Sequence, residues 1–402
     1  MRRVTAIALF AMLFAGILLP FRRVDSADRR EPAQALPSPE KDPVTPINKP
    51  DYFAWQLFVY VNAPGPYQTE VTAGGQKVST NNALWETWAS DDDTFPAQPD
   101  PTKPPTWPGK DRGHRMKLRP RALRPKTAHA EGVLNPDEEV FRNKPAFKYI
   151  MDNQLYYTQG LAAAFKNKLR VSFPTDAIEI KANWVKIKPE DKTKYHWNYD
   201  ETGTLYGLVA MHISSKVLPN WFWATFEWTD NPGRSDYIGS RDTFGVTYLN
   251  SGPFQPPNAT ELGKVYPAGT VTKELESLFG DAGYKEEWKA EWMNYRLKGS
   301  QVDFADSTGI PTLLGNSVTE HGFVASASCI TCHSRAAVAA DGHDAFGSGF
   351  KPSLPGDNQQ SYNGYPDPNW FWQILDSPNP DLKCLQVDFV WAIPQLARPA
   401  KQ

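Results

Sequence analysis

The chain has 402 residues, of which 40% are hydrophobic and 13% aromatic, and its formal net charge is −2. That much apolar surface excludes an intrinsically disordered chain and suffices for one large domain or two medium-sized ones. A charge so close to zero gives no indication of nucleic-acid binding, and the 36 prolines favour long loops over long helices.

The first 26 residues have the features of a secretory signal peptide. Arg2 and Arg3 give a positive start, residues 4–21 are almost wholly apolar, and Val24 and Ser26 occupy the positions that a signal peptidase reads. We therefore expect cleavage after Ser26 and a periplasmic protein. The alternative is an uncleaved anchor in the inner membrane, because the apolar run is nearly long enough to span it.

The next segments predict a linker followed by a helix. Residues 27–50 are polar and rich in proline, which is typical of a linker. Within 51–65 the apolar residues fall on one helical face, and Asn62 and Pro64 would end the helix. The ordered body is therefore expected to begin at Asp51.

A long proline-rich loop is expected over 96–126. Nine residues from Lys103 to Lys126 are lysine or arginine. The simple interpretation is a solvated surface loop. The alternative is that residues 103–126 form a docking patch for an acidic redox partner protein.

The middle of the chain predicts strands and then helix. Three segments have the residue types of strands: 177–188, 203–219 and 221–228. A helical pattern follows over 270–297, where Thr270 or Thr272 could cap the first turn and Gly280 with Gly283 would divide the helix in two.

Two of the three cysteines lie in Cys329-Ile330-Thr331-Cys332-His333, the CxxCH pattern of c-type haem attachment. In such a site each thiol adds to one vinyl group of the porphyrin, and the histidine binds the iron as its proximal ligand. Two intervening residues on a helical turn place the sulfurs at the separation of the vinyl groups. The motif therefore predicts one covalent haem c on Cys329, Cys332 and His333.

Two other kinds of site also use closely spaced cysteines. A thioredoxin-like dithiol begins a helix after a βαβ pattern, and no such pattern precedes Cys329. A zinc site needs a second ligand pair, which His343 and Cys384 do not supply at metal spacing. Cys384 is expected to be a buried structural cysteine.

The distal iron ligand is the open question. Electron-transfer cytochromes place a methionine after the motif, but no methionine follows Met293. The main candidates are Met211 and His212, and only one of them could reach the haem because neighbours on a strand face opposite ways. His343 is a weaker candidate, and an open distal position is the remaining alternative.

Several stretches resemble a group of exported proteobacterial proteins that are labelled "cytochrome c family protein". The stretches are 53–62, 84–88, 178–184, 211–228, 295–336 and 386–399. The resemblance implies a covalent haem on Cys329, Cys332 and His333, and it implies no substrate.

We expect an α+β fold. Residues 51–299 would form a mixed, largely antiparallel sheet with peripheral helices, and residues 300–402 a helical, haem-bearing segment packed on it. The preferred function is electron transfer by a mono-haem cytochrome. The alternatives are a haem enzyme of peroxidase or oxygenase type with an open distal site, which the large body favours, and a haem-based sensor of small ligands.

Overall fold

The computed structural model describes residues 43–109, 116–120, 137–231, 242–247, 268–320, 324, 327–346, 364–373 and 381–401. All of them belong to one compact unit, Ala35–Gln402. The expected signal peptide lies outside the described residues, as does most of the expected linker. The linker's last part is helical, since α1 spans Val44–Asn48. No helix in the described part of the chain is both long and apolar enough to cross a membrane.

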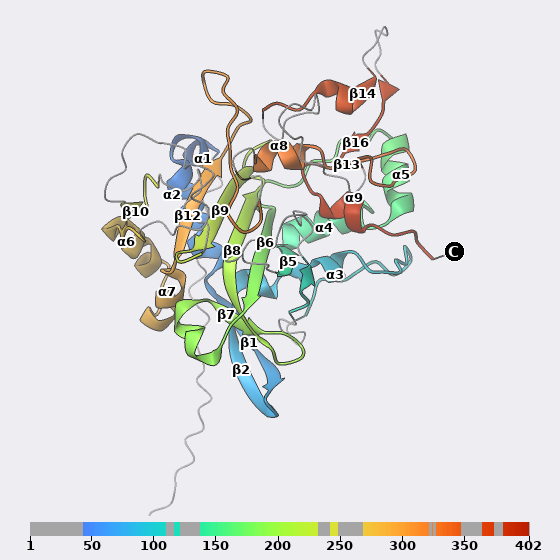
Figure 1. Ribbon diagram of the computed structural model, residues 1–402. Helices are drawn as coiled ribbons and strands as arrows, with labels where there is room; N and C mark the ends of the chain where they lie inside the picture. The colour runs from blue at the N-terminus through green and yellow to red at the C-terminus, as the bar shows by residue number, and fades with distance from the viewer. Residues whose placement is uncertain are drawn as a thin grey trace, which may run out of the picture. The chain divides into compact units, whose positions relative to one another are not determined.

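An eight-stranded antiparallel sheet forms the centre (Figure 1), with the path β12-β9-β8-β6-β5-β3, β4 beside β5 and β7 beside β8. Its strands are β3 (Ala89–Ser90), β4 (Arg119–Pro120), β5 (Asp137–Arg142), β6 (Ile178–Lys186), β7 (Trp197–Tyr199), β8 (Leu205–Ser215), β9 (Phe222–Trp228) and β12 (Tyr295–Gln301). The prediction of an α+β fold with an antiparallel sheet is confirmed, and β6, β8 and β9 match the three predicted strands.

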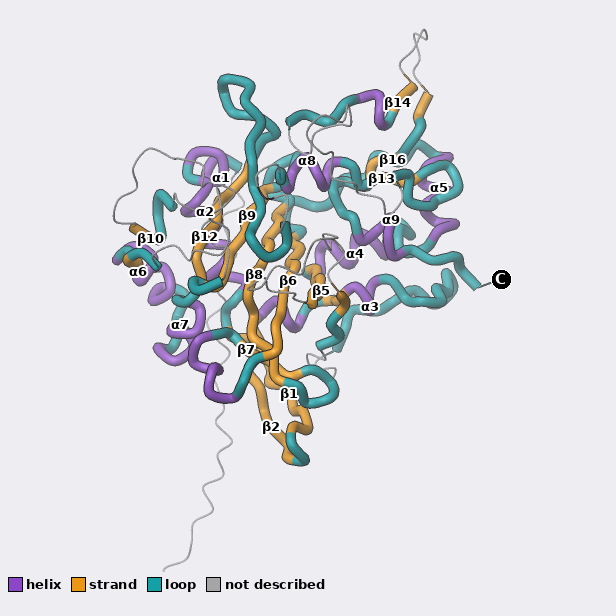
Figure 2. Tube along the Cα trace, in the orientation of Figure 1, coloured by secondary structure: helices purple, strands orange, loops and turns teal. Residues whose placement is uncertain are grey.

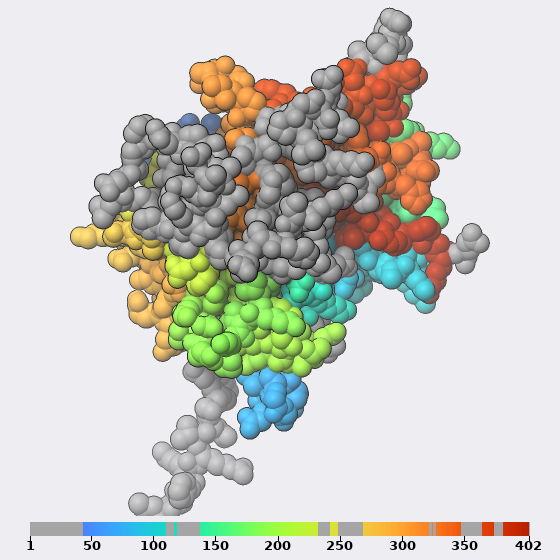
Figure 3. Space-filling model, viewed as in Figure 1, coloured from blue at the N-terminus to red at the C-terminus, as the bar shows by residue number. Residues whose placement is uncertain are grey.

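Within the described residues, four two-stranded pairs lie beside this sheet: β1 (Pro64–Ala73) with β2 (Gln76–Ala83), β10 (Val246–Thr247) with β11 (Thr270–Val271), β13 (Ala337–Val338) with β16 (Leu385–Gln386), and β14 (Trp372–Gln373) with β15 (Asp381–Leu382). The β1–β2 hairpin extends beyond the central sheet (Figure 1), and its blue atoms project at the bottom of the space-filling view (Figure 3). Gly74 and Gly75, at φ 57° and 79°, make its tight turn, which suits the twist of paired strands.

Helices surround the sheet (Figure 2). They are α2 (Pro50–Val61), α3 (Asp91–Thr94), α4 (Lys144–Asp152), α5 (Thr158–Lys166), α6 (Lys273–Asp281), α7 (Glu286–Trp292), α8 (Cys329–Ser334) and α9 (Ala392–Leu396), with 3-10 turns at Leu84–Thr87, Pro189–Lys194 and Pro368–Trp370. The predicted α2 packs on the sheet through Trp55 and Phe58, whose ring centroids lie 5.0 and 4.3 Å from that of Phe226 on β9. One core therefore lies between α2 and the sheet.

The helical pattern over 270–297 is correct at its start and wrong at its end. Thr272 caps α6, since its Oγ1 accepts a hydrogen bond from Leu275 N at 3.1 Å. Gly283 adopts φ 71° between α6 and α7, as the predicted division requires. Tyr295, however, begins β12, because pairing with β9 overrides the local helical preference.

A second core joins the C-terminal segment to the body. Buried side chains of the body, among them Trp221 and Trp223, share this cluster with Ile330 of α8 and with Val387 and Ile393 near the C-terminus. The segment that carries the CxxCH motif therefore packs on the sheet instead of forming its own core.

A buried charged histidine predicts that stability depends on pH. His196 lies between Glu86 and Glu291, with ring nitrogen to carboxylate distances of 3.0 and 3.3 Å, and stacks on Trp292 at 4.4 Å. Although burial disfavours the imidazolium, the two carboxylates raise the pKa of His196 from 6.5 to about 9. The raised folded-state pKa contributes stability that is complete below about pH 6.5 and is lost as the pH rises through about 9.

We expect the charged His196 to contribute roughly 3 kcal/mol to the free energy of unfolding. Urea unfolding measured from pH 6 to 9.5 should show the decline, and His196→Gln should flatten it. An equal decline in both proteins would show that His196 is not its source.

Candidate functional site

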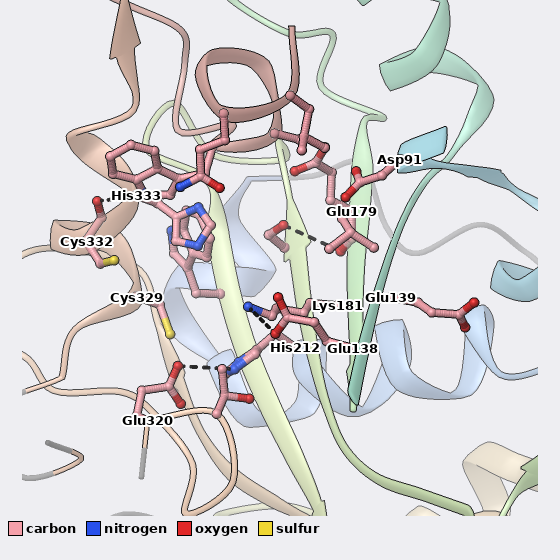
Figure 4. Close-up of a pocket in the computed structure, with 18 of the residues that line it drawn as sticks. Asp91, Glu138, Glu139, Glu179, Lys181, His212, Glu320, Cys329, Cys332 and His333 are labelled. Atoms are coloured by element: carbon pink, nitrogen blue, oxygen red, sulfur yellow. Dashed lines mark hydrogen bonds and ion pairs between the residues drawn. The ribbon is translucent and has the colours of Figure 1, made fainter. Parts of the chain in front are cut away.

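A cavity of about 300 Å³ lies against the face of the sheet that α2 does not cover. On β8, Met211 and Ile213 point into the core with α2, whereas His212 and Ser214 line the cavity. The rest of the wall comes from β3 and α3, from Lys117, from β5, β6 and β9, from the loop before α8, and from α8 and α9 (Figure 4). The cavity therefore brings the C-terminal segment and the sheet together.

The CxxCH motif forms α8, and its start is fixed by the end of β12. Ser328 is the N-cap residue, and its Oγ accepts a hydrogen bond from Gln301 Nε2 at 2.8 Å. Gln301 Oε1 in turn accepts one from Ile330 N at 3.0 Å. As a result, Cys329 and Cys332 both line the cavity (Figure 4).

His333 follows on the same short helix and also lines the cavity. Its Nδ1 donates a hydrogen bond to the carbonyl of Phe389 at 2.8 Å, which fixes the tautomer and leaves Nε2 without a proton. The ring packs on Trp223 with a centroid distance of 4.6 Å. Burial lowers the pKa of His333 to about 4, and the neighbouring charges of Lys181 and His212 act in the same direction. The imidazole is therefore neutral, which is the form that binds iron.

The two thiols of the motif are held in their protonated form. Burial raises the pKa of Cys332 to about 12 and that of Cys329 well above its ordinary value. Redox-active dithiols need the opposite, a cysteine with a depressed pKa. The raised pKa values of Cys329 and Cys332 thus disfavour the thioredoxin-like alternative.

His212 lines the same cavity from β8. Its Nε2 lies 3.3 Å from Glu320 Oε1 and 3.3 Å from Asn316 Nδ2. Its buried Nδ1 has no hydrogen-bond partner among the residues that the structure describes. Although burial opposes ionisation, the charge and hydrogen bond of His212 lower the pKa of Glu320, so this carboxylate is ionised at neutral pH.

The structure places the other two distal candidates away from the cavity. Met211 is fully buried on the opposite face, where its Sδ accepts a weak hydrogen bond from Asn62 Nδ2 at 3.9 Å. His343 is exposed in a turn and is not part of the cavity wall. Of these three candidates, His212 is the one that lines the cavity with the motif, and the identity of the distal ligand stays a prediction.

The far wall carries charges that the sequence did not single out. Lys181 on β6 pairs with Glu138 on β5 at 3.0 Å. Arg142 binds Asp91 at 2.5 Å and Glu179 at 3.2 Å, and both carboxylates line the cavity. The alternation in the stretch 178–184, where Glu179 and Lys181 stand between apolar residues, is the one signal that could have indicated this polar face.

The described part of the basic loop reaches this wall with Lys117. Of residues 103–126, the structure describes 103–109 and 116–120. Lys117 lines the cavity and lies 3.6 Å from Asp92. The role of the loop as a docking patch stays a prediction.

The residues present fit a covalent haem. Two protonated thiols and one neutral imidazole with a free Nε2 face one cavity from a single helical turn, and an imidazole with a buried unpaired nitrogen faces it from β8. Within the described ranges, no three His, Cys, Asp or Glu side chains are grouped so as to hold a bare metal ion.

No protein-family model, no curated protein and no solved structure matches the chain.

Proposed function

We propose that the protein is an exported mono-haem c-type cytochrome, with the haem joined to Cys329 and Cys332 and with His333 as its proximal ligand. Each S–H would add across one vinyl group, so that sulfur bonds one carbon, the hydrogen goes to the other, and no oxidant is needed. One observation carries the proposal: all three motif side chains face the same cavity. The proposal agrees with the resemblance and with the expected signal peptide.

A haem bound there would supply one-electron redox chemistry at its iron. Electron transfer is the activity that we propose, with His212 as the second axial ligand. Its support is the position of His212 in the wall and its unpaired Nδ1, a buried nitrogen that a bond to iron or a ring flip would satisfy. A redox partner protein would then receive or supply the electron.

A haem enzyme of peroxidase or oxygenase type is the second candidate. One observation favours it: the Nε2 of His212 already contacts Glu320 and Asn316, so the iron's distal position could stay open. In that case His212 and Glu320 would hold and move a proton next to the bound substrate.

Carbon monoxide separates the two candidates. With His212 bound to iron, the optical spectrum of the reduced protein should not change within seconds of adding carbon monoxide. His212→Ala should open the position and give rapid binding, whereas His343→Ala, an exposed control, should behave like the parent protein. Rapid binding by the unsubstituted protein would reject the carrier and support the enzyme or sensor.

A further inference from the structure

The segment 385–391, here called the C-terminal clasp, closes over the end of α8. Its hydrogen bonds to that region include those from Val387 N to Ala336 O at 2.9 Å, from Gln386 Nε2 to Ser334 O at 3.1 Å and from Trp391 Nε1 to Cys332 O at 3.1 Å. In the other direction, His333 Nδ1 donates to the Phe389 carbonyl at 2.8 Å. β16, within the clasp, also pairs with β13 just after α8. The position of the clasp therefore decides where the Phe389 carbonyl meets His333.

The clasp has an unusual backbone at this point. Asp388 and Phe389 are consecutive residues with φ 51° and 71°. Neither is glycine, and a left-handed conformation is uncommon for other residues, above all for an aromatic one. Such a conformation persists where the surroundings hold it, and it is found preferentially at functional sites.

A buried ion pair holds this turn. Lys216 Nζ donates to Asp388 Oδ1 at 2.5 Å and to the Pro219 carbonyl at 2.6 Å. The other carboxylate oxygen of Asp388 accepts a hydrogen bond from Phe173 N at 2.7 Å. Lys216 and Asp388 are only 6% and 9% exposed. Both carboxylate oxygens are thus tied to the body, one of them to the residue directly after β8.

The same strand reaches the cavity from the other side. His212, Ser214 and Lys216 alternate along one face of β8 and its extension, and the first two line the cavity. β8 therefore carries His212, the distal candidate. Lys216, directly after β8, is linked to the proximal His333 through Asp388 and the carbonyl of its neighbour Phe389.

We propose that Lys216 and Asp388 are positioning residues for His333, an inference that rests on the proposed haem site. Their ion pair holds the left-handed turn, so that the Phe389 carbonyl accepts the Nδ1 proton and Nε2 is directed into the cavity. A firmly held acceptor at Nδ1 makes the imidazole a stronger donor and stabilises the oxidised iron. The pair would thus set the reduction potential without touching the haem.

Lys216→Met tests this inference in the full-length protein with covalent haem. It keeps the length of the side chain and removes the charge that fixes Asp388. We expect covalent haem to remain and the reduction equilibrium to shift about tenfold towards the reduced form, or about 59 mV for one electron. In the His212→Ala background, where the iron would have five ligands, we expect the iron–histidine stretching band to move to lower frequency. Lys298→Met is the matched control, because Lys298 is also buried and lies 3.8 Å from Glu227. It should leave both quantities unchanged.

Two outcomes would overturn the inference: an unchanged potential and band in Lys216→Met, or equal shifts in both lysine variants. Lack of covalent haem in the unsubstituted protein would instead contradict the proposed function.

If Lys216→Met does not accumulate, Asp388→Asn and Asp388→Ala are compared in its place. Asparagine tolerates the left-handed turn and can still accept from Lys216, so its potential should stay near that of the parent, whereas alanine should shift it. Equal potentials in these two variants would also overturn the inference.

Discussion

Replacing Cys329 and Cys332 together with serine is expected to abolish covalent haem attachment. A serine hydroxyl keeps the size and polarity of the thiol but does not add to a vinyl group under the conditions of cytochrome maturation. Each single variant leaves one thioether and should keep part of the covalent haem. Haem that stays with the denatured polypeptide in acidified acetone is the quantity to measure.

The third cysteine supplies the matched control for this experiment. Cys384 is not part of the cavity wall, so Cys384→Ser should retain the full amount of covalent haem. His333→Ala should keep the thiols in place but lose the proximal ligand, and its reduced spectrum should differ from that of the parent. Covalent haem in the double serine variant would mean that the attachment lies elsewhere.

Arg142→Met should cost about 3–5 kcal/mol in the free energy of unfolding, as expected when one partner of a buried ion network is removed. Arg142 is fully buried and binds Asp91 and Glu179, and its Nη1 also donates to Thr94 Oγ1 at 2.6 Å. Methionine fills similar space but leaves the two carboxylates without their cation. Burial raises the pKa of Glu179 and Arg142 opposes that rise, so the variant should also bind a proton there more readily.

Urea unfolding monitored by tryptophan fluorescence measures the loss in the free energy of unfolding caused by Arg142→Met. Lys148→Met is the control, because the exposed pair of Lys148 and Asp152 on α4 is worth at most about 0.5 kcal/mol. A loss below about 1 kcal/mol for Arg142→Met would show that the network is not needed to hold β3, β5 and β6 together.

The short helix that holds Cys329, Cys332 and His333 could be predicted from sequence because the pattern is local. The spacing of Cys329, Cys332 and His333 is set by one helical turn, and α8 provides that turn. Strand alternation predicts that only one of Met211 and His212 can face the haem, but it does not say which one. Only the packing of α2 on the other face decides that His212 is the one that lines the cavity.

The supporting residues could not be predicted, because their partners are distant along the chain. Lys216 and Asp388 are separated by 172 positions, and nothing in either neighbourhood indicates the other. Glu320 gains its role from His212, 108 positions earlier by their numbering. The strand β12 was missed for the same reason, since its pairing with β9 outweighs a helical pattern that is visible only locally.

A peptide mass spectrum shows whether Cys329 and Cys332 hold a covalent haem. The mature protein is purified from a host that is competent in cytochrome maturation, extracted with acidified acetone, treated with a thiol-alkylating reagent and digested. We expect the peptide containing Cys329 and Cys332 to carry the mass of one intact haem and to take up no reagent at either cysteine. A peptide without added mass, alkylated at both cysteines, would contradict it.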